Sequence, residues 1–408
     1  MPTLLPFDVS ASTLPDYCRA LRRALDGTGP AIQPYAGTPP TPADPAAVEQ
    51  APDELALVVS TSGSTGSPKR AMLTRDALVA SIDATHERLG GAGQWLLCMP
   101  AHHIAGTQVL LRSMRHGDPG PIIATAFSID GFIADTARLT AERRYTSLVP
   151  TQLRRLLDAG PQALAALTAY DEILLGGAAT PPTLLAAARG SGVTVLTTYG
   201  MSETAGGCVY DGAPLRPTGV VLDEDGRITL TGATIASGYL GDPQRTAAVF
   251  GMSTPVEATG DTTPDSDPGD AGDGTPDVVR TFRTDDIGEW SDGRLHVLGR
   301  IDDLITTGGL KVAPRVVEEA AAALPDVLEA VALGLPDHEW GQAVGLAVRA
   351  RKPLQVQQIR DLLRDSLPPY ALPRRLLQVD ELPLRGPGKP DRAALAAAPG
   401  WQTLPAHH

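Results

Sequence analysis

Short apolar runs that alternate with helix-like segments constrain the fold of this chain more than any other feature. Each run has the length of a buried strand, roughly four to eight residues, and each is followed by enough chain for a helix. The runs lie at residues 57–60, 95–100, 121–124, 145–149, 172–178 and 193–200. This alternation predicts an α/β fold in which layered sheets are covered by helices.

The length of the chain predicts more than one domain. Its 408 residues exceed the roughly 250–300 residues at which one hydrophobic core stops growing. The residues after 302 contain a turn at 306–309, helices at 314–324 and 356–366, strands at 329–335 and 344–350, and a C-terminal tail. We therefore predict a short N-terminal segment, residues 1–52, which has one helix at 14–25 and a proline-rich linker and is part of the large domain; the main multi-sheet portion of that domain, 53–301; and a small mobile α+β lid, 302–408.

Charge and cysteine content exclude several classes of function. The net charge of −13 disfavours nucleic acid and anionic membranes as partners, because both select clustered Lys and Arg. Cys18, Cys98 and Cys208 are too far apart in sequence for a Cys-x-x-Cys site. The start of the chain does not resemble a signal peptide, so we expect a cytoplasmic protein without membrane insertion. A homodimer is compatible with the sequence.

An acidic stretch without any basic residue covers residues 251–279. Its composition predicts a disordered surface loop. A role as a nucleic-acid mimic is the alternative for such a stretch.

The loop from Thr61 to Lys69 follows the first apolar run and has the composition of a phosphate-binding loop. Its glycines let the backbone approach a ligand, and its N–H groups and hydroxyls can surround phosphate oxygens. It is not a P-loop, because Gly66 is followed by Ser67-Pro68-Lys69 rather than directly by lysine. A flexible surface loop has the same composition. Lysine is rare here, at four residues against thirty arginines, so Lys69 is notable.

Eight short motifs, taken together, resemble those of the adenylate-forming enzymes. This superfamily includes acyl- and aryl-CoA ligases, peptide-synthetase adenylation domains and luciferases. The motifs occur in the family's order, from about residue 55 to 395, at 60–69, 100–106, 176–178, 199–204, 238–239, 283–286, 299–303 and 386–389. The resemblance implies a large N-terminal domain, a mobile C-terminal domain, and ATP, Mg²⁺ and coenzyme A as cofactor and co-substrates.

The resemblance assigns roles in the first half-reaction, in which a carboxylate attacks ATP and forms an acyl-AMP. Lys389, Glu203 and Lys69 would be catalytic, with Glu203 holding the metal ion. Asp286 and Arg300 would bind the ribose. The nucleotide-binding residues implied in this way are Thr61, Ser62, Gly63, Ser64, Thr65, Gly66, Gly176, Gly177, Ala178, Thr198, Tyr199, Gly200, Met201, Ser202, Asp286 and Arg300.

The second half-reaction, attack of the CoA thiol on the acyl-AMP, would follow a rotation of the small domain. Asp302 occupies the family's hinge position. Thr307, Gly308 and Gly309 resemble the segment that lines the pantetheine tunnel.

Segments 145–157 and 199–212, with the short N-terminus, resemble actinobacterial o-succinylbenzoate–CoA ligases of menaquinone biosynthesis. The implied substrate carries two carboxylates, so it needs a second anion site. Arg112, Arg154 and Arg155 are candidates for that site, and each is equally compatible with a helix surface. The predicted aryl pocket contains His103, Thr151, Gln152, Ser202 and Gly207. A metal at His102 and His103 is disfavoured, because no further ligands follow at zinc-like spacing.

Three residues depart from the family pattern without removing a catalytic group. Arg70 and Asp285 stand where glycine is usual, and Thr306 where lysine is frequent. The alternatives are a CoA ligase for another aryl or medium-chain acid, an adenylation enzyme that loads a carrier protein, and a silent nucleotide-binding protein. The last is disfavoured because the catalytic residue types are all present.

Overall fold

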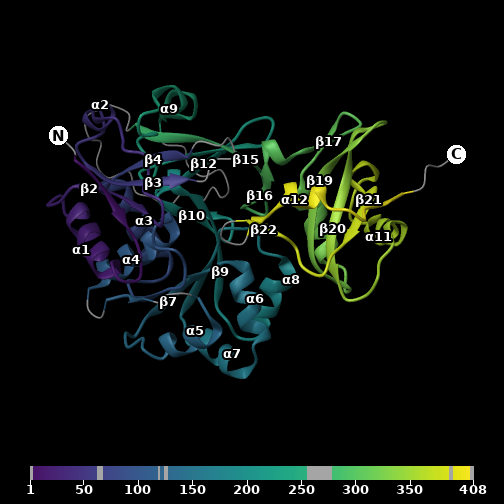
Figure 1. The fold of residues 1–408 in the computed structure, drawn as a ribbon, viewed down its shortest axis with the longest axis horizontal. Helices are drawn as coiled ribbons and strands as arrows, with labels where there is room; N and C mark the ends of the chain where they lie inside the picture. Colours follow the sequence, from purple (N-terminus) through teal and green to yellow (C-terminus); the bar gives the residue numbers. More distant parts are fainter. Residues whose placement is uncertain are drawn as a thin grey trace.

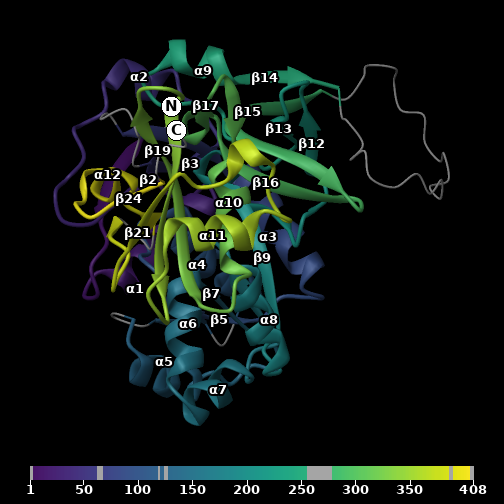
Figure 2. The ribbon, with the colours of Figure 1, turned by 90° about the vertical axis from the view of Figure 1, so that its right-hand side faces the viewer.

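Figure 1 shows a large body formed by the first 300 or so residues and a smaller one formed by the rest. The structure is a computed structural model. It describes residues 3–61, 68–117, 120–123, 127–254, 278–385 and 389–404, without the side chains of Thr61, His116, Arg385 and Lys389. In the view from the small body, the sheet containing β12 to β16 and helices α5 to α8 lie at opposite ends of the large one (Figure 2). Within the described residues, every helix is too short or too polar to cross a bilayer.

The first sheet of the large domain corrects the prediction for the N-terminal segment. Its strands are β1 (Leu4–Asp8), β2 (Ala31–Tyr35), β3 (Leu55–Thr61) and β4 (Lys69–Thr74), in that spatial order. Helix α1 (Leu14–Leu25) has the predicted bounds, and α2 (Pro45–Glu49) lies in the predicted linker. The sequence did not predict β1 and β2, because each is short and carries a proline. The segment is thus part of the sheet framework.

The loop at 62–67 joins β3 to the antiparallel strand β4. Strand β4 is not among the strands that we expected from the sequence. Thr74, its last residue, caps the next helix, α3 (Arg75–Arg88), because its hydroxyl accepts a hydrogen bond from the Ala77 N–H at 3.2 Å.

The second sheet contains the predicted apolar runs after the first one, which lies in β3, as parallel strands covered on both faces. Its order is β11-β10-β9-β8-β7-β5-β6. The strands are β5 (Gln94–Leu97), β6 (Ile122–Ile123), β7 (Arg144–Leu148), β8 (Glu172–Leu175), β9 (Val195–Met201), β10 (Gly206–Tyr210) and β11 (Ala213–Pro214), the last two antiparallel. The helices are α3, α4 (Ile104–His116), α5 (Ile129–Thr136), α6 (Pro150–Asp158), α7 (Pro161–Leu167) and α8 (Pro182–Gly190).

Two hydrophobic cores explain why these strands are apolar without alternation. Trp95 and Leu97 join one core with α1, α3 and α4. Leu96 and Cys98 point the other way and join a second core with α5 to α8. A strand buried on both faces needs apolar residues at consecutive positions.

The third sheet is formed by the strands that follow β11. It has the order β12-β13-β15-β14, with β16 paired to β15. The elements are β12 (Gly219–Leu222), β13 (Arg227–Thr231), α9 (Pro243–Val249), β14 (Phe250–Ser253), β15 (Val279–Ser291) and β16 (Arg294–Arg300). Most of the predicted acidic loop, residues 255–277, lies outside the described residues, and its flanks Ser253 and Val279 pair between β14 and β15.

The small domain is a six-stranded sheet with helices, and it extends through the segment that we expected to be a tail. The sheet contains β17 (Ile305–Thr307), β18 (Leu310–Val312), β19 (Val327–Asp337), β20 (Gly341–Ala350), β21 (Arg375–Gln378) and β24 (Gln402–Thr403). The remaining elements are η2 (Ile301–Asp303), α10 (Pro314–Ala322), α11 (Val356–Leu363), η3 (Pro369–Ala371), α12 (Arg392–Ala397) and the hairpin β22 (Leu384–Arg385) with β23 (Lys389–Pro390). The domain boundary near residue 302 stays a prediction.

Candidate active site

The turn after β9 places Glu203 at the carboxyl end of the parallel strands, the edge where open α/β sheets bind ligands. The chain passes from β9 into a 3-10 turn, η1 (Ser202–Thr204). The Thr204 hydroxyl accepts a hydrogen bond from the Met201 N–H at 2.9 Å and donates to the Gly206 carbonyl at 2.7 Å. The Glu203 carbonyl accepts from the Ala236 N–H at 2.8 Å. These contacts fix the backbone that carries Glu203.

Tyr239 connects two of the predicted catalytic residues. Its hydroxyl donates to Oε1 of Glu203 at 2.8 Å, and Lys69 Nζ lies 5.6 Å from the centroid of its ring. Burial, together with the adjacent Glu203 carboxylate, raises the pKa of Tyr239 well above its usual range, so the hydroxyl keeps its proton. The sequence motif at 238–239 included Tyr239, but we assigned it no role.

Glu203 is suited to bind a Mg²⁺ ion whose coordination would be completed by water and phosphate oxygens. Glu203 is only 6% exposed, and the hydrogen bond from Tyr239 orients its Oε1 atom. Among the described residues, no group of three or more His, Cys, Asp or Glu side chains could enclose a metal alone. Mg²⁺ is commonly held by one or two carboxylates together with substrate phosphates.

Tyr199 and Asp286 form the second polar pair of the site. The Tyr199 hydroxyl donates to Asp286 Oδ2 at 2.7 Å, and Asp286 in β15 is paired in register with Arg300 in β16. Burial raises the pKa of the Asp286 carboxyl, while the Tyr199 bond and the Arg300 charge oppose that rise. A carboxylate oriented in this way can accept hydrogen bonds from two ribose hydroxyls.

Asp285, one of the three departures from the family pattern, lies between two arginines. Its Oδ1 is 2.9 Å from Arg227 Nη2 and its Oδ2 is 3.4 Å from Arg300 Nη2. Arg300 also donates to both oxygens of Asp302, from Nε at 2.8 Å and from Nη2 at 3.1 Å. Asp285, which stands where glycine is usual, therefore has two cationic partners. Through Arg300 it is linked to Asp302, the predicted hinge residue.

Arg70 lies beside the predicted phosphate loop and has a structural contact. Its Nη1 donates to the Thr41 carbonyl at 3.4 Å, and its own carbonyl accepts from the Leu240 N–H at 2.8 Å. Arg70 thus connects β4 to the N-terminal segment and to the chain next to Tyr239.

The predicted adenine-binding residues lie where two strands end close together. A Cβ on Gly176 would lie 2.4 Å from Thr198 Oγ1, and one on Gly200 would lie 2.1 Å from the Gly206 carbonyl oxygen. Neither position has room for a side chain. Gly177 and Ala178 follow Gly176 at the end of β8.

Comparison with known proteins places the chain in a family. Its sequence matches the model of the family described as "AMP-binding enzyme" over residues 18–240. It also matches the model described as "AMP-binding enzyme C-terminal domain" over residues 316–389. The chain belongs to the AMP-binding enzyme family. It is 41% identical over 386 residues to the probable 2-succinylbenzoate–CoA ligase of Mycobacterium tuberculosis, covering 92% of this chain and 93% of the relative. The 2-succinylbenzoate–CoA ligase of Geobacillus kaustophilus is 29% identical, covering 81% of this chain and 66% of the relative.

Solved structures of AMP-binding enzymes have the same two-domain fold. The o-succinylbenzoate CoA synthetase of Bacillus subtilis, in complex with its acyl-adenylate intermediate, matches with a TM-score of 0.67 at 25% identity, covering 86% of this chain and 70% of that chain. The amide bond synthetase of Marinactinospora thermotolerans matches with a TM-score of 0.71 at 24% identity, covering 96% of this chain and 79% of that chain. At this identity, the match shows a similarity of fold. The predicted fold class, with a large N-terminal and a smaller C-terminal domain, is confirmed.

Several predicted AMP-binding residues cannot be placed. Ser62, Gly63, Ser64, Thr65 and Gly66 lie outside the described residues. Thr61 ends β3 and Lys389 begins β23, but their side chains are not described. The roles of these residues stay predictions.

The predicted acid-pocket residues lie at the ends of neighbouring strands. His103 precedes α4, and its ring centroid is 4.2 Å from that of His102. Thr151 lies in the first turn of α6, and Gly207 in β10. The Gln152 amide accepts from the Val149 N–H at 2.9 Å and donates to the Cys98 carbonyl at 3.0 Å. Gln152 therefore has a structural use, and a contact with substrate stays a prediction.

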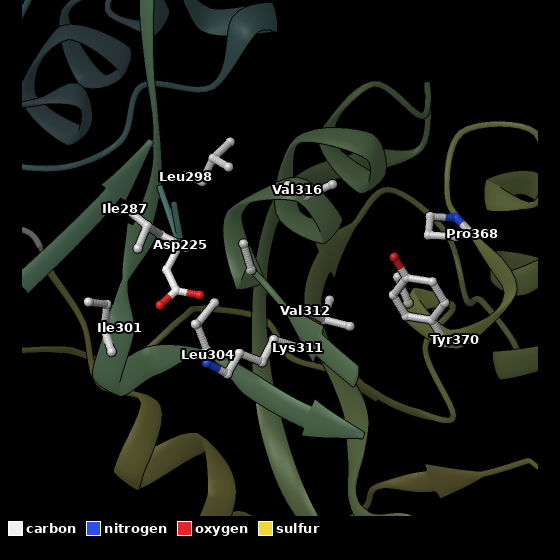
Figure 3. Close-up of a pocket in the computed structure, with 12 residues that line it drawn as sticks. Asp225, Ile287, Leu298, Ile301, Leu304, Lys311, Val312, Val316, Pro368 and Tyr370 are labelled. Atoms are coloured by element: carbon white, nitrogen blue, oxygen red, sulfur yellow. The ribbon is translucent and has the colours of Figure 1, made fainter. Parts of the chain in front are cut away.

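The predicted hinge borders a cleft between the two domains. Asp302 lies in η2, and Arg300 holds the pKa of its carboxyl below the usual range. Figure 3 shows the cleft, of about 340 Å³, with Ile287 and Leu298 from the large domain opposite Lys311 and Val316 from the small one. Ile301 and Leu304, which lie on either side of Asp302 in the sequence, also line it.

The predicted pantetheine segment packs within the small domain. Gly308 and Gly309 form the turn between β17 and β18, with φ values of +56° and +81° that favour glycine. The Gly308 N–H donates to the Trp340 carbonyl at 3.0 Å. A Cβ on Gly308 would lie 2.7 Å from the Trp340 ring. Thr307, just before the turn, is buried.

Proposed function

We propose that this protein is an ATP-dependent ligase that adenylates o-succinylbenzoate and transfers the acyl group to coenzyme A, a step of menaquinone biosynthesis. The observation that supports the adenylation chemistry most is the contact of Tyr239 with both Glu203 and Lys69, close to the end of β9. The identity of the acid is supported by relatives whose names specify 2-succinylbenzoate, the first at 41% identity over 92% of this chain.

In the first step, a carboxylate oxygen of the acid attacks the α-phosphorus of ATP. The bond from that phosphorus to the bridging oxygen breaks, and pyrophosphate leaves. Residues 61–69 hold the β- and γ-phosphates, and the ammonium of Lys389 stabilises the negative charge that develops. Glu203 would hold Mg²⁺, which would supply positive charge beside the phosphate oxygens. Asp286 and Arg300 orient the ribose.

In the second step, the CoA thiol releases its proton to water and the thiolate attacks the acyl carbonyl; the bond from the acyl carbon to the phosphate oxygen breaks, and AMP leaves. The small domain turns about Asp302, so that Lys389 is replaced by the segment Thr307 to Gly309. This role of the segment rests on its resemblance to the family's pantetheine-lining segment, since the Trp340 ring already lies 2.7 Å from the Cβ position of Gly308. We place the reaction in the cytoplasm, where ATP and coenzyme A are available.

Pyrophosphate release tests the proposal. The purified protein is given ATP, Mg²⁺ and a panel of aryl and medium-chain acids, with and without CoA. We expect o-succinylbenzoate to be turned over with the highest kcat/KM, and the thioester to appear when CoA is added. Turnover of another acid only would refute the substrate, and no pyrophosphate with any acid would refute the adenylation.

A second assay separates CoA from the carrier-protein alternative. The acyl-AMP formed in the first step is offered either CoA or a phosphopantetheinyl carrier protein. Transfer to CoA is expected. Transfer to the carrier alone would move the protein to the class of carrier-loading enzymes.

A further inference from the structure

Arg392, the first residue of α12, contacts three other elements of the small domain. Its Nη2 donates to Oε1 of Glu318 in α10 at 2.8 Å, and its Nε donates to the carbonyl oxygen of Ala332 in β19 at 3.1 Å. Its Nη1 lies 3.7 Å from Oδ2 of Asp303 in η2. Lys389, the predicted adenylation lysine, precedes Arg392 by three residues. One side chain thus joins the end of the lysine-bearing segment to a helix, a sheet and the turn at the predicted hinge.

The contact with Glu318 holds the Arg392 guanidinium more firmly than a surface ion pair would. The Glu318 side chain is 17% exposed, and its Oε1 also accepts a hydrogen bond from the Ala332 N–H at 3.0 Å. Burial raises the pKa of the Glu318 carboxyl, while the charge of Arg392 and the Ala332 N–H oppose that rise. Removing one partner of such a buried pair leaves the other charge without compensation. The Arg392 side chain is therefore held in one place.

The hairpin that contains Lys389 has little support of its own. Within the described residues, β22 and β23 pair with each other and with no further strand. An isolated two-stranded hairpin is marginally stable in water. Its base is closed by a hydrogen bond from the Asp391 N–H to the Pro383 carbonyl at 2.8 Å, and Arg392 comes directly after that bond. The orientation of the hairpin on the small domain therefore depends on how the chain around Asp391 is anchored.

Helix α12 has anchors other than Arg392. Leu395, on the same helix, is 1% exposed and belongs to a hydrophobic core with Val331 of β19. Asp391 caps the helix, because its Oδ1 accepts a hydrogen bond from the Ala394 N–H at 3.0 Å. These contacts hold the helix against the sheet. The contacts of Arg392 are then left to set the direction in which the chain runs between α12 and β23.

We propose that Arg392 is a positioning residue for Lys389 in the adenylation step, and that it acts by fixing β23 relative to Glu318 and Asp303. This inference rests on the proposed adenylation of a carboxylic acid. The ammonium of Lys389 stabilises developing charge only when it is correctly placed, and a misplacement of about 1 Å lowers a rate by about 100-fold. Because Asp303 follows Asp302, Arg392 also fixes β23 relative to the proposed hinge. Transfer to CoA does not use Lys389, so Arg392 should not affect that step.

The experiment measures the two half-reactions separately in wild type, Arg392→Gln and Arg392→Lys. Adenylation is followed as pyrophosphate release with the acid that wild type adenylates fastest, and CoA transfer as thioester formation from pre-made acyl-AMP. In Arg392→Gln, kcat for adenylation should fall by about 10- to 100-fold, while KM for ATP and the rate of CoA transfer change by less than about threefold. Arg392→Lys should recover part of the loss, because it keeps a positive charge beside Glu318.

A double variant tests whether Arg392 acts through Lys389. If it does, Arg392→Gln should lower adenylation by less than about threefold once Lys389→Ala has been made, because the effects of two residues that act as a unit do not add. A structural role alone would lower adenylation by the same factor with and without Lys389.

The matched control is Lys352→Gln in the same domain. Lys352 Nζ lies 2.8 Å from Asp326 Oδ2, the same length as the contact between Arg392 and Glu318, but the Lys352 side chain is 62% exposed. Because exposed ion pairs contribute little, this variant should behave as wild type in both steps.

Asp303→Ala covers the case in which Arg392→Gln does not fold. It removes the partner of the 3.7 Å contact and leaves the bond to Glu318 in place. It should lower adenylation by about 3- to 10-fold and leave CoA transfer within about threefold of wild type. Equal losses in both steps, or no loss in adenylation, would overturn the inference in either variant, as would equal effects of Arg392→Gln with and without Lys389. Failure of the proposed function is distinct, because wild type would then release no pyrophosphate with any acid.

Discussion

Replacing Tyr239 with phenylalanine tests whether Glu203 is positioned by this tyrosine. The change removes the hydroxyl that lies 2.8 Å from Glu203 Oε1. It keeps the ring, which Lys69 Nζ approaches to 5.6 Å and which packs edge-on against Phe250 with 5.3 Å between centroids. The perturbation is therefore confined to one hydrogen bond to one carboxylate.

The size of the effect follows from the charge and the burial of that bond. A hydrogen bond to a charged group contributes about 1.5–3 kcal/mol, which corresponds to a factor of about 10–150 in rate. Glu203 is 6% exposed, so water does not easily replace the lost donor. We expect kcat/KM for MgATP to fall by about that factor, with half-maximal activity at a higher Mg²⁺ concentration.

A second readout does not depend on catalysis. The free energy of unfolding, measured in urea with EDTA present, should fall by about 1–3 kcal/mol because a buried carboxylate oxygen loses its partner. Tyr370→Phe is the control, since Tyr370 is 44% exposed and its hydroxyl should contribute little. If Tyr239→Phe matched this control in stability and in Mg²⁺ dependence, Glu203 would not depend on Tyr239 for its position.

Three further predictions concern the ribose site and the lid. Asp285→Asn should raise KM for ATP about two- to fivefold and lower the free energy of unfolding by less than about 1 kcal/mol, because its two partly exposed ion pairs are individually weak; a larger loss in urea unfolding would contradict this view. Tyr199→Phe removes a hydrogen bond that lowers the pKa of Asp286, and only the ionised carboxylate accepts hydrogen bonds from both ribose hydroxyls. As the pH is lowered, the variant should therefore lose AMP binding at a higher pH than wild type. An unchanged pH profile would argue against Asp286 as the ribose acceptor. Lys389→Ala should lower adenylation by about 100-fold or more and leave CoA transfer from pre-made acyl-AMP nearly unchanged; equal losses in both steps, with the fold preserved, would contradict a moving lid.

The sequence predicted the buried parallel strands well because their signal is local. Residues 95–98 are apolar at every position, and the structure buries them alternately in two cores. Strands β1 and β2 escaped prediction for the opposite reason. Each is five residues long with an internal proline, and each becomes a strand only through its neighbour, since β1 pairs with β2 and β2 pairs with β3.

The candidate site was predictable as a set of residues but not as a set of contacts. The motifs supplied Glu203, Asp286 and Arg300, because each lies in a short conspicuous segment. The bond from Tyr239 to Glu203 joins residues 36 apart, and the bond from Tyr199 to Asp286 joins residues 87 apart. No local pattern encodes such pairs, so the partner that orients each catalytic group had to come from the fold.

The departure at Asp285 illustrates how a substitution that the sequence could only flag acquires a physical reason. A carboxylate beside Asp286 would place two like charges next to each other, which is unfavourable without compensation. Arg227, in β13, supplies that compensation through its contact with Asp285 and also donates from Nε to the Thr284 carbonyl at 2.5 Å. Because Arg300 contacts both Asp285 and Asp302, the added carboxylate gives the guanidinium a second ionic partner. Under the proposed rotation of the small domain about Asp302, Arg300 would keep Asp285 as an ionic partner, which a glycine at 285 could not provide.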